Sequence, residues 1–249
     1  MDLARHVEVA GCFNFRDLGG YPAAGGMTTR WRRLFRSDGL VGLSDEAMAS
    51  LAALEVATVV DLRSPGEVAN RGRFAHETVR YHHLPFTESL PGADEAAQWD
   101  DHRFVSARYT NILVDASAAV VSAVEVLAAP AALPAVFHCS VGKDRTGVLA
   151  AVVLGLLGVP DEVIVADYAL SQVAVERFLG SLRTSVSDSA ESSALVERYA
   201  PALLSASPES MAGFLAGVRR DHGSFEGLAD DLGIARAASQ LRAELLQAG

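Results

Sequence analysis

Lysine is nearly absent from this chain of 249 residues, in which Lys143 is the single lysine among 21 lysines and arginines. Positive charge is also outweighed overall, since the formal net charge is −10 and the pI is about 5.1. Nucleic acids and anionic membrane surfaces attract basic proteins, so this balance argues against both kinds of partner. An anionic substrate must therefore be attracted by a local group of cations against the overall field.

Cysteine is scarce as well. The two cysteines, Cys12 and Cys139, are too few for a disulfide framework, and a reducing compartment is the default expectation. Nothing in the sequence places Cys12 beside Cys139, so we interpret Cys12 as a small core residue. No second group of Cys and His has the spacing of metal ligands, and we expect neither zinc nor any other cofactor.

Long apolar runs are missing. The longest, around residues 148–159, is too short to span a membrane and is typical of a core helix. Residues 1–11 carry charges throughout and lack the apolar segment of a signal peptide. We expect a cytoplasmic protein with no integral membrane segment, with export independent of a signal peptide as an open alternative. No feature of the sequence indicates an oligomeric state.

Half of the residues are hydrophobic, which is enough to bury the core of one large domain over residues 1–249. Strand and helix signals alternate in the first part, about 11–171, and helix signals dominate the extension, about 172–249. This order predicts an α/β fold with a largely parallel central sheet flanked by helices, and a helical C-terminal cap that sets pocket depth. The functional site should lie at the C-terminal end of a strand.

The local signals place the individual elements. The predicted strands are 56–62, 79–84 and 133–137. The predicted helices begin at Ser44, span 114–128 and 148–157, and begin again at Pro160. Ser44 is a favourable N-cap, followed by acidic residues that suit a first helical turn. The polar segment 87–102 is expected to form a mobile rim over the pocket, and a Ser-rich break is expected near 184–193.

The segment His-Cys-Ser-Val-Gly-Lys-Asp-Arg-Thr-Gly, residues 138–147, joins a predicted strand to a predicted helix. The unpaired N–H groups at such a helix start, together with inward-turned loop N–H groups, suit a phosphate. Cys139 would lie at the floor of this nest, where nearby positive charge favours the thiolate. Arg145 can hold two phosphate oxygens with its planar guanidinium.

These residues predict covalent catalysis. The Cys139 thiolate would attack phosphorus in line and form a phosphocysteine, which water then hydrolyses. Thr146 is placed to donate a hydrogen bond to the departing thiolate. The remaining phosphate contacts are expected from Ser140, Val141, Gly142 and Lys143.

Other readings of this segment fit less well. A nucleotide-binding P-loop is excluded because Asp144 follows Gly142-Lys143 and Phe137 stands where the leading glycine should be. We interpret His138 as a residue that orients the loop. A rhodanese-like sulfurtransferase lacks the Cys-x5-Arg-Thr spacing, and a phosphate-binding pseudophosphatase usually loses a cysteine or arginine that this chain retains.

The segment resembles the HCxxGKDRTG signature of cysteine-dependent phosphatases. Further matches are FNFRDLGG at 13–20, LFRSD at 34–38, VDLRS with Glu67 at 60–67, and VIVADY at 163–168. Together they resemble the bacterial and fungal tyrosine phosphatases of the mycobacterial PtpB type. The resemblance implies a protein-tyrosine phosphatase with Cys139 as nucleophile and Arg145 as phosphate-binding arginine.

The resemblance leaves the substrate open. Family members with Lys and Asp in the loop often accept phosphoinositides, and some accept phosphoserine or phosphothreonine. Lys143 would then bind a second phosphate, and phosphoinositide hydrolysis as the main activity is the alternative function. Equally, Lys143 could act only on Cys139 and the loop.

The general acid is the second open question, because the Trp-Pro-Asp tripeptide of many tyrosine phosphatases is absent. Asp144, within the loop, is our first candidate, and Asp61, at the end of a predicted strand, is the second. For Asp61 an ion pair with Arg63 or Arg16 is at least as good an interpretation. Arg16 and Asp17 themselves are interpreted as a buried ion pair that fixes an N-terminal turn.

Overall fold

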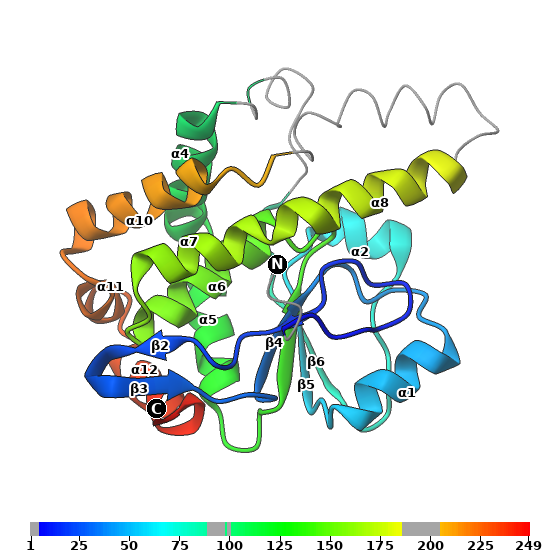
Figure 1. Ribbon diagram of the computed structural model, residues 1–249, viewed down its shortest axis with the longest axis horizontal. Helices are drawn as coiled ribbons and strands as arrows, with labels where there is room; N and C mark the ends of the chain where they lie inside the picture. The colour runs from blue at the N-terminus through cyan, green and yellow to red at the C-terminus, as the bar shows by residue number, and fades with distance from the viewer. Residues whose placement is uncertain (1–4, 89–97, 99–100, 186–204) are drawn as a thin grey trace.

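A mostly parallel sheet of five strands forms the centre of the computed structural model (Figure 1), which describes residues 5–88, 98, 101–185 and 205–249. In spatial order the strands are β1 (Arg16–Asp17), β4 (Leu34–Ser37), β7 (Ala135–His138), β5 (Thr58–Asp61) and β6 (Arg80–His83). β4, β7, β5 and β6 pair in parallel, and β1 pairs with β4 in the antiparallel sense. The predicted fold class is confirmed.

The central strands are apolar because both of their faces are covered. Successive side chains of a strand point to opposite faces, and the chain shows this alternation directly. Val59 and Val136 belong to one hydrophobic cluster, whereas their neighbours Val60 and Phe137 belong to the other. Two separate cores, one on each face, therefore hold β7 in place.

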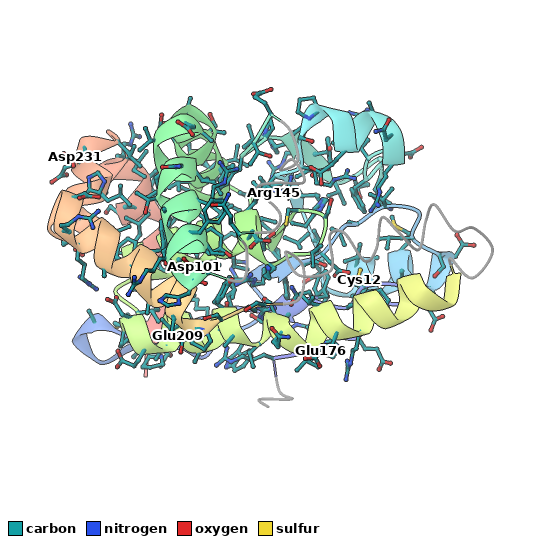
Figure 2. The ribbon with its side chains drawn as sticks, turned by 90° about the horizontal axis from the view of Figure 1, so that it is seen from above. Cys12, Asp101, Arg145, Glu176, Glu209 and Asp231 are labelled. Atoms are coloured by element: carbon teal, nitrogen blue, oxygen red, sulfur yellow. The ribbon has the colours of Figure 1, made fainter. Side chains whose placement is uncertain are left out.

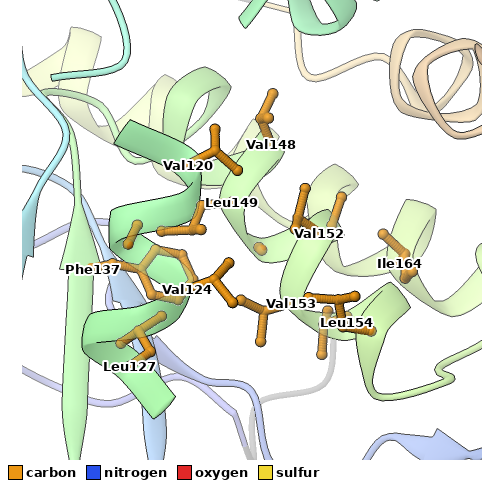
Figure 3. Close-up of a cluster of buried hydrophobic side chains, with 14 of the residues drawn as sticks. Val120, Val124, Leu127, Phe137, Val148, Leu149, Val152, Val153, Leu154 and Ile164 are labelled. Carbon is orange, nitrogen blue, oxygen red and sulfur yellow. The ribbon is translucent and has the colours of Figure 1, made fainter. Parts of the chain in front are cut away.

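The larger core lies on the face covered by most of the helices (Figure 1). These helices are α4 (His102–Asp115), α5 (Ser117–Ala128), α6 (Asp144–Leu156), α7 (Asp161–Ala169), α10 (Pro208–His222), α11 (Phe225–Asp231) and α12 (Ala235–Leu245). Residues 145–156 of α6 are all buried, so this helix has no polar face. Figure 3 shows side chains of α6, among them Leu149 and Val153, facing Val124 of α5.

The second, smaller core lies on the opposite face, under α1 (Asp45–Ala53) and the N-terminal segment. The N-cap predicted at Ser44 is confirmed, because its side chain accepts a hydrogen bond from the backbone N–H of Ala47 at 3.3 Å. α2 (Pro65–Arg71) begins with a capping box in which Ser64 and Glu67 each bind the other's backbone N–H. The same Glu67 side chain reaches the candidate site.

The remaining elements lie at the edges of these layers. They are α8 (Ser171–Ser185), the 3-10 turn η1 (Ala24–Gly26), and a three-stranded antiparallel sheet of β2 (Pro22–Ala23), β3 (Met27–Thr29) and β8 (Leu246–Ala248). The sequence favours helix up to the C-terminus, but the extension ends in a strand. Residues 246–248 are extended because they pair with the edge strand β3. The C-terminal helices α10 to α12 contribute to the larger core.

The predicted strands and the helix starts at Ser44 and Pro160 are confirmed, with two corrections. The helix predicted over 148–157 is α6, which already begins at Asp144. The expected helix 114–128 is in fact the end of α4 followed by α5, and the two helices are bent by 77° relative to each other. The sequence does not reveal α4, because charged and polar residues are mixed with its apolar ones and it packs its apolar face against α10. Most of the expected rim, 87–102, and of the expected break, 184–193, lies outside the described residues.

Among the described residues, no single helix combines the length and the hydropathy of a membrane span. α4 and α5 pass such a test only as a bent pair.

Candidate active site

The loop between β7 and α6 lies at the C-terminal ends of the parallel strands, as predicted. Cys139 follows β7 directly, is 2% exposed, and its Sγ accepts a hydrogen bond from the backbone N–H of Gly142 at 3.3 Å. Gly142 has a φ of +72°, and a Cβ there would lie 2.5 Å from the carbonyl oxygen of Ser37. Only glycine lets the loop curl around the sulfur this tightly.

The outer side of this loop is held by two side chains. Asn14 donates from Nδ2 to the carbonyl oxygens of Val141 at 3.1 Å and Gly142 at 2.9 Å. Arg36 donates to the Gly142 carbonyl at 2.8 Å. The C=O and N–H of a trans peptide point in opposite directions, so carbonyls fixed outward turn the following N–H groups toward Cys139.

Both of these side chains depend on Asp167 of α7. The Asp167 carboxylate lies 2.9 Å from Arg16 Nε and 2.6 Å from Arg36 Nη1, and it accepts a hydrogen bond from Tyr21 at 2.9 Å. Arg16 also donates to the side chain of Asn14. Burial alone would raise the pKa of Asp167, but the two guanidinium groups outweigh it and hold the pKa well below its usual range.

This arrangement corrects the interpretation of Arg16 and Asp17 as an ion pair with each other. Arg16 does form a buried ion pair, but its partner is Asp167. Asp17 instead accepts hydrogen bonds from the backbone N–H groups of Gly19 and Arg32, both at 2.7 Å, and so fixes the N-terminal turn. Sequence alone could not supply the partner, because Asp167 is 151 positions away along the chain.

Arg145 lies in the first turn of α6 and is held by Glu67. Two guanidinium nitrogens contact the two Glu67 oxygens, at 2.5 and 3.0 Å, and the Ser140 hydroxyl donates to the same carboxylate. Burial works against both charges. The hydrogen bonds and charge of Arg145 nevertheless lower the pKa of Glu67 to about 2, and the neighbouring Cys139, followed by Glu67, raises the pKa of Arg145. Figure 2 shows Arg145 toward the middle of the molecule, whereas Asp231 and Glu176 lie at its periphery.

Asp144 is the first residue of α6, and its side chain is 20% exposed. Its Oδ1 accepts a hydrogen bond from the Tyr109 hydroxyl at 2.5 Å and lies 3.5 Å from Lys143 Nζ. The Tyr109 hydroxyl in turn lies 2.7 Å from that of Tyr168. The sequence singles out neither tyrosine, since α4 is not predicted and Tyr168 counts only as part of a family match.

Lys143 is 1% exposed, and its Nζ donates to the carbonyl oxygen of Ser205 at 3.0 Å. Ser205 lies just before α10, so the lysine ties the loop to the C-terminal helices. The ammonium is thus directed at protein groups, and both Ser205 and Asp144 lie within its reach.

Asp61, the last residue of β5, is fully buried. An ion pair with Arg63 is one predicted alternative to a role as acid, and this ion pair is present at 2.5 Å. Asp61 also accepts a hydrogen bond from Tyr81 at 2.8 Å. Burial alone would raise the pKa of Asp61, but the hydrogen bonds from Arg63 lower it overall. Its catalytic role stays a prediction.

His138 and Thr146 are the remaining residues of the loop segment with a predicted role. Burial lowers the pKa of His138, whose Nδ1 lies 3.1 Å from the Cys139 carbonyl oxygen, in keeping with a residue that orients the loop. The Thr146 hydroxyl is buried and has no hydrogen-bond partner in the described part of the chain. A departing thiolate would supply an acceptor for it.

Cys12 is a partly buried free thiol that packs against the smaller core. Burial, followed by the negative charge of Asp38, raises its pKa to about 12, so it stays a thiol at neutral pH. No group of three or more His, Cys, Asp and Glu residues within the described ranges could hold a metal ion.

A buried cysteine beneath inward-facing N–H groups, followed by a fixed arginine, is typical of cysteine-dependent phosphatases. The model of the tyrosine phosphatase family matches residues 7–247, and the chain belongs to this family. It is an enzyme of the protein-tyrosine phosphatase class.

Several known proteins are similar to this chain. The triple specificity protein phosphatase PtpB of Mycobacterium tuberculosis is 29% identical over 96% of this chain and 98% of its own length. A tyrosine-protein phosphatase of Nostoc commune is 32% identical over 55% of this chain and 47% of its own length. A solved structure of TpbA from P. aeruginosa in complex with phosphotyrosine covers 57% of this chain and 71% of its own, with 19% identity and a TM-score of 0.31.

The Glu67–Arg145 pair should make stability depend on pH. Glu67→Gln should lower the free energy of unfolding by about 3 kcal/mol at neutral pH, because it leaves a buried arginine without its charged partner. The folded pKa of Glu67, about 2, is below its ordinary value of 4.5, so this contribution is complete above pH 4.5 and declines as the pH falls toward 2. Urea unfolding of the wild type and of Glu67→Gln across this range measures the difference in their free energies of unfolding. A difference that stays constant below pH 4.5 would contradict the prediction.

Proposed function

We propose that the enzyme hydrolyses phosphotyrosine in proteins through a phosphocysteine intermediate. The observation that carries this proposal is the position of the Cys139 sulfur, inside a loop whose Gly142 N–H points at it while Asn14 and Arg36 hold the carbonyls outward. The Gly142 N–H and the N–H groups that follow the outward-held carbonyls would bind the phosphate oxygens. Arg145, fixed by Glu67, would hold two of these oxygens from the side.

In the first step, the Cys139 thiolate forms a bond to phosphorus, and the bond between phosphorus and the tyrosine oxygen breaks. The leaving oxygen takes a proton from a carboxylic acid. In the second step, water attacks phosphorus and the phosphorus–sulfur bond breaks. The buried hydroxyl of Thr146, next in sequence to Arg145, would then donate to the thiolate as it departs.

Asp144 is the better-supported acid. Its side chain is partly exposed at the loop, whereas Asp61 is fully buried and engaged by Arg63 and Tyr81. Asp144 would donate its proton to the ester oxygen and recover one from the attacking water in the second step. Asp61 would instead act on the loop through its neighbour His138, whose Nε2 lies 3.8 Å from the carboxylate.

The nucleophile is tested by Cys139→Ser. Wild-type enzyme should hydrolyse aryl phosphates, and the variant should lose at least about 10³-fold in kcat, because an alcohol at this position is not ionised. Trapping a phosphorylated enzyme at Cys139 by rapid quench and mass spectrometry gives the second measurement. Absence of turnover by folded wild-type enzyme would refute the function.

The acid is tested by Asp144→Asn and Asp61→Asn. Asp144→Asn should lose about 100-fold in kcat on phenyl phosphate and the basic limb of its pH profile, while keeping most of its rate on 2,4-dinitrophenyl phosphate. The activated phenolate leaves without a proton, which is why the loss depends on the leaving group. If Asp61→Asn shows this selective loss instead, the assignment is reversed.

The substrate range beyond phosphotyrosine depends on Lys143. The relative PtpB of M. tuberculosis bears the name triple specificity, which favours a broader range for this chain as a second candidate function. Phosphoserine, phosphothreonine and phosphoinositides are the substrates to compare. The Lys143 ammonium, however, is buried against Ser205 and Asp144. A second phosphate would have to replace these contacts, so we favour a role in holding the loop.

Lys143→Ala distinguishes the two roles. A lysine that holds the loop should affect all substrates alike, with a loss of about tenfold in kcat/KM on both a phosphotyrosine peptide and a phosphoinositide. Steady-state phosphate release from the two substrates measures the ratio. A selective loss on the phosphoinositide would establish Lys143 as a ligand of the second phosphate.

A further inference from the structure

The Tyr109 hydroxyl lies at the centre of a hydrogen-bonded row that ends at the proposed acid. When Asp144 is ionised it can only accept, so Tyr109 donates to Oδ1 at 2.5 Å. The Tyr109 oxygen is then the acceptor for the Tyr168 hydroxyl at 2.7 Å. Burial, and then the negative charge of Asp144, raises the pKa of both phenols, so both remain donors at neutral pH.

The position of the Tyr109 ring is fixed by helices on either side of it. Tyr109, from α4, makes edge-to-face contacts with Tyr168 of α7 and Phe214 of α10, at centroid distances of 6.0 and 6.2 Å. α7 in turn approaches α6 closely at Gly147, where a Cβ would lie 3.0 Å from the Tyr168 ring. The hydroxyl is therefore aimed at Asp144 by packing, since a ring with these neighbours has little room to turn.

The bond between Tyr109 and Asp144 constrains both of its partners. The Tyr109 oxygen already accepts from Tyr168, so its single proton is directed at Asp144. On the carboxylate, this bond fixes Oδ1, which also lies 3.5 Å from Lys143. With one oxygen fixed, the orientation of the other is fixed too.

We propose that Tyr109 is a positioning residue for the general acid, which holds Oδ1 of Asp144 so that Oδ2 faces the leaving group. The inference rests on the proposed function. Tyr109 keeps its own proton throughout, and the proton that reaches the ester oxygen comes from Asp144. Without the hydroxyl, the carboxyl group would rotate, and proton delivery would lose its geometry.

The test compares two substrates in Tyr109→Phe, a variant that removes only the hydroxyl. On phenyl phosphate, which needs the acid, kcat should fall about tenfold. On 2,4-dinitrophenyl phosphate, which does not, it should fall less than about twofold. A merely structural role would lower both rates by the same factor, and that result would overturn the proposal.

A double-mutant cycle locates the effect. In the Asp144→Asn background, Tyr109→Phe should have no further effect on phenyl phosphate, since there is no acid left to position. An undiminished tenfold loss in that background would also overturn the proposal. Should Tyr109→Phe not fold, Tyr168→Phe takes its place. This variant keeps the bond from Tyr109 to Asp144 but removes the donor that strengthens it, so the loss should be smaller than tenfold and still confined to phenyl phosphate. Equal losses on both substrates in this variant would overturn the proposal.

Tyr81→Phe is the matched control. It removes a phenol that donates to Asp61 as Tyr109 donates to Asp144. Because Asp61 is not the proposed acid, any change in rate should be the same on both substrates. A selective loss there would transfer the role to Asp61 and Tyr81. Turnover of 2,4-dinitrophenyl phosphate that depends on Cys139 reports the proposed function separately, because this substrate needs no acid.

Discussion

The outward orientation of the loop carbonyls is the constraint on which this site depends. A loop that binds phosphate through its N–H groups must direct its C=O groups elsewhere, and a buried carbonyl needs a donor. Asn14 and Arg36 are those donors. Asp167 holds Arg36 directly, and it holds Asn14 through Arg16. A carboxylate on α7 thereby shapes a loop between β7 and α6.

The helix α7 supports the site twice, through two consecutive residues. Asp167 connects to the backbone of the loop, and Tyr168 connects through Tyr109 to the side chain of Asp144. On a helix, consecutive side chains point about 100° apart, so one helix can reach two neighbouring elements at once. The loop backbone and the proposed acid thus share one rigid support.

Much of the fold is predictable because its signals are local. The strand before Cys139, the helix after it and the N-cap at Ser44 follow from short runs of residues whose periodicity or capping is self-contained. The loop itself is predictable for the same reason, since its chemistry lies within ten consecutive positions. α4 is not predictable, because its sequence has a weak helical pattern and the helix depends on packing against α10. Tyr109, which lies on α4, is therefore not predicted either.

The sequence by itself determined the proposed reactive centre: Cys139, Arg145 and Thr146 stand at spacings that a phosphate loop requires, whatever surrounds them. Tertiary structure decided which partners hold that centre. Glu67 meets Arg145 across 78 positions, and Arg16 meets Asp167 across 151. Such ion pairs form only where the fold removes both charges from water and brings them together, and no local pattern records that choice.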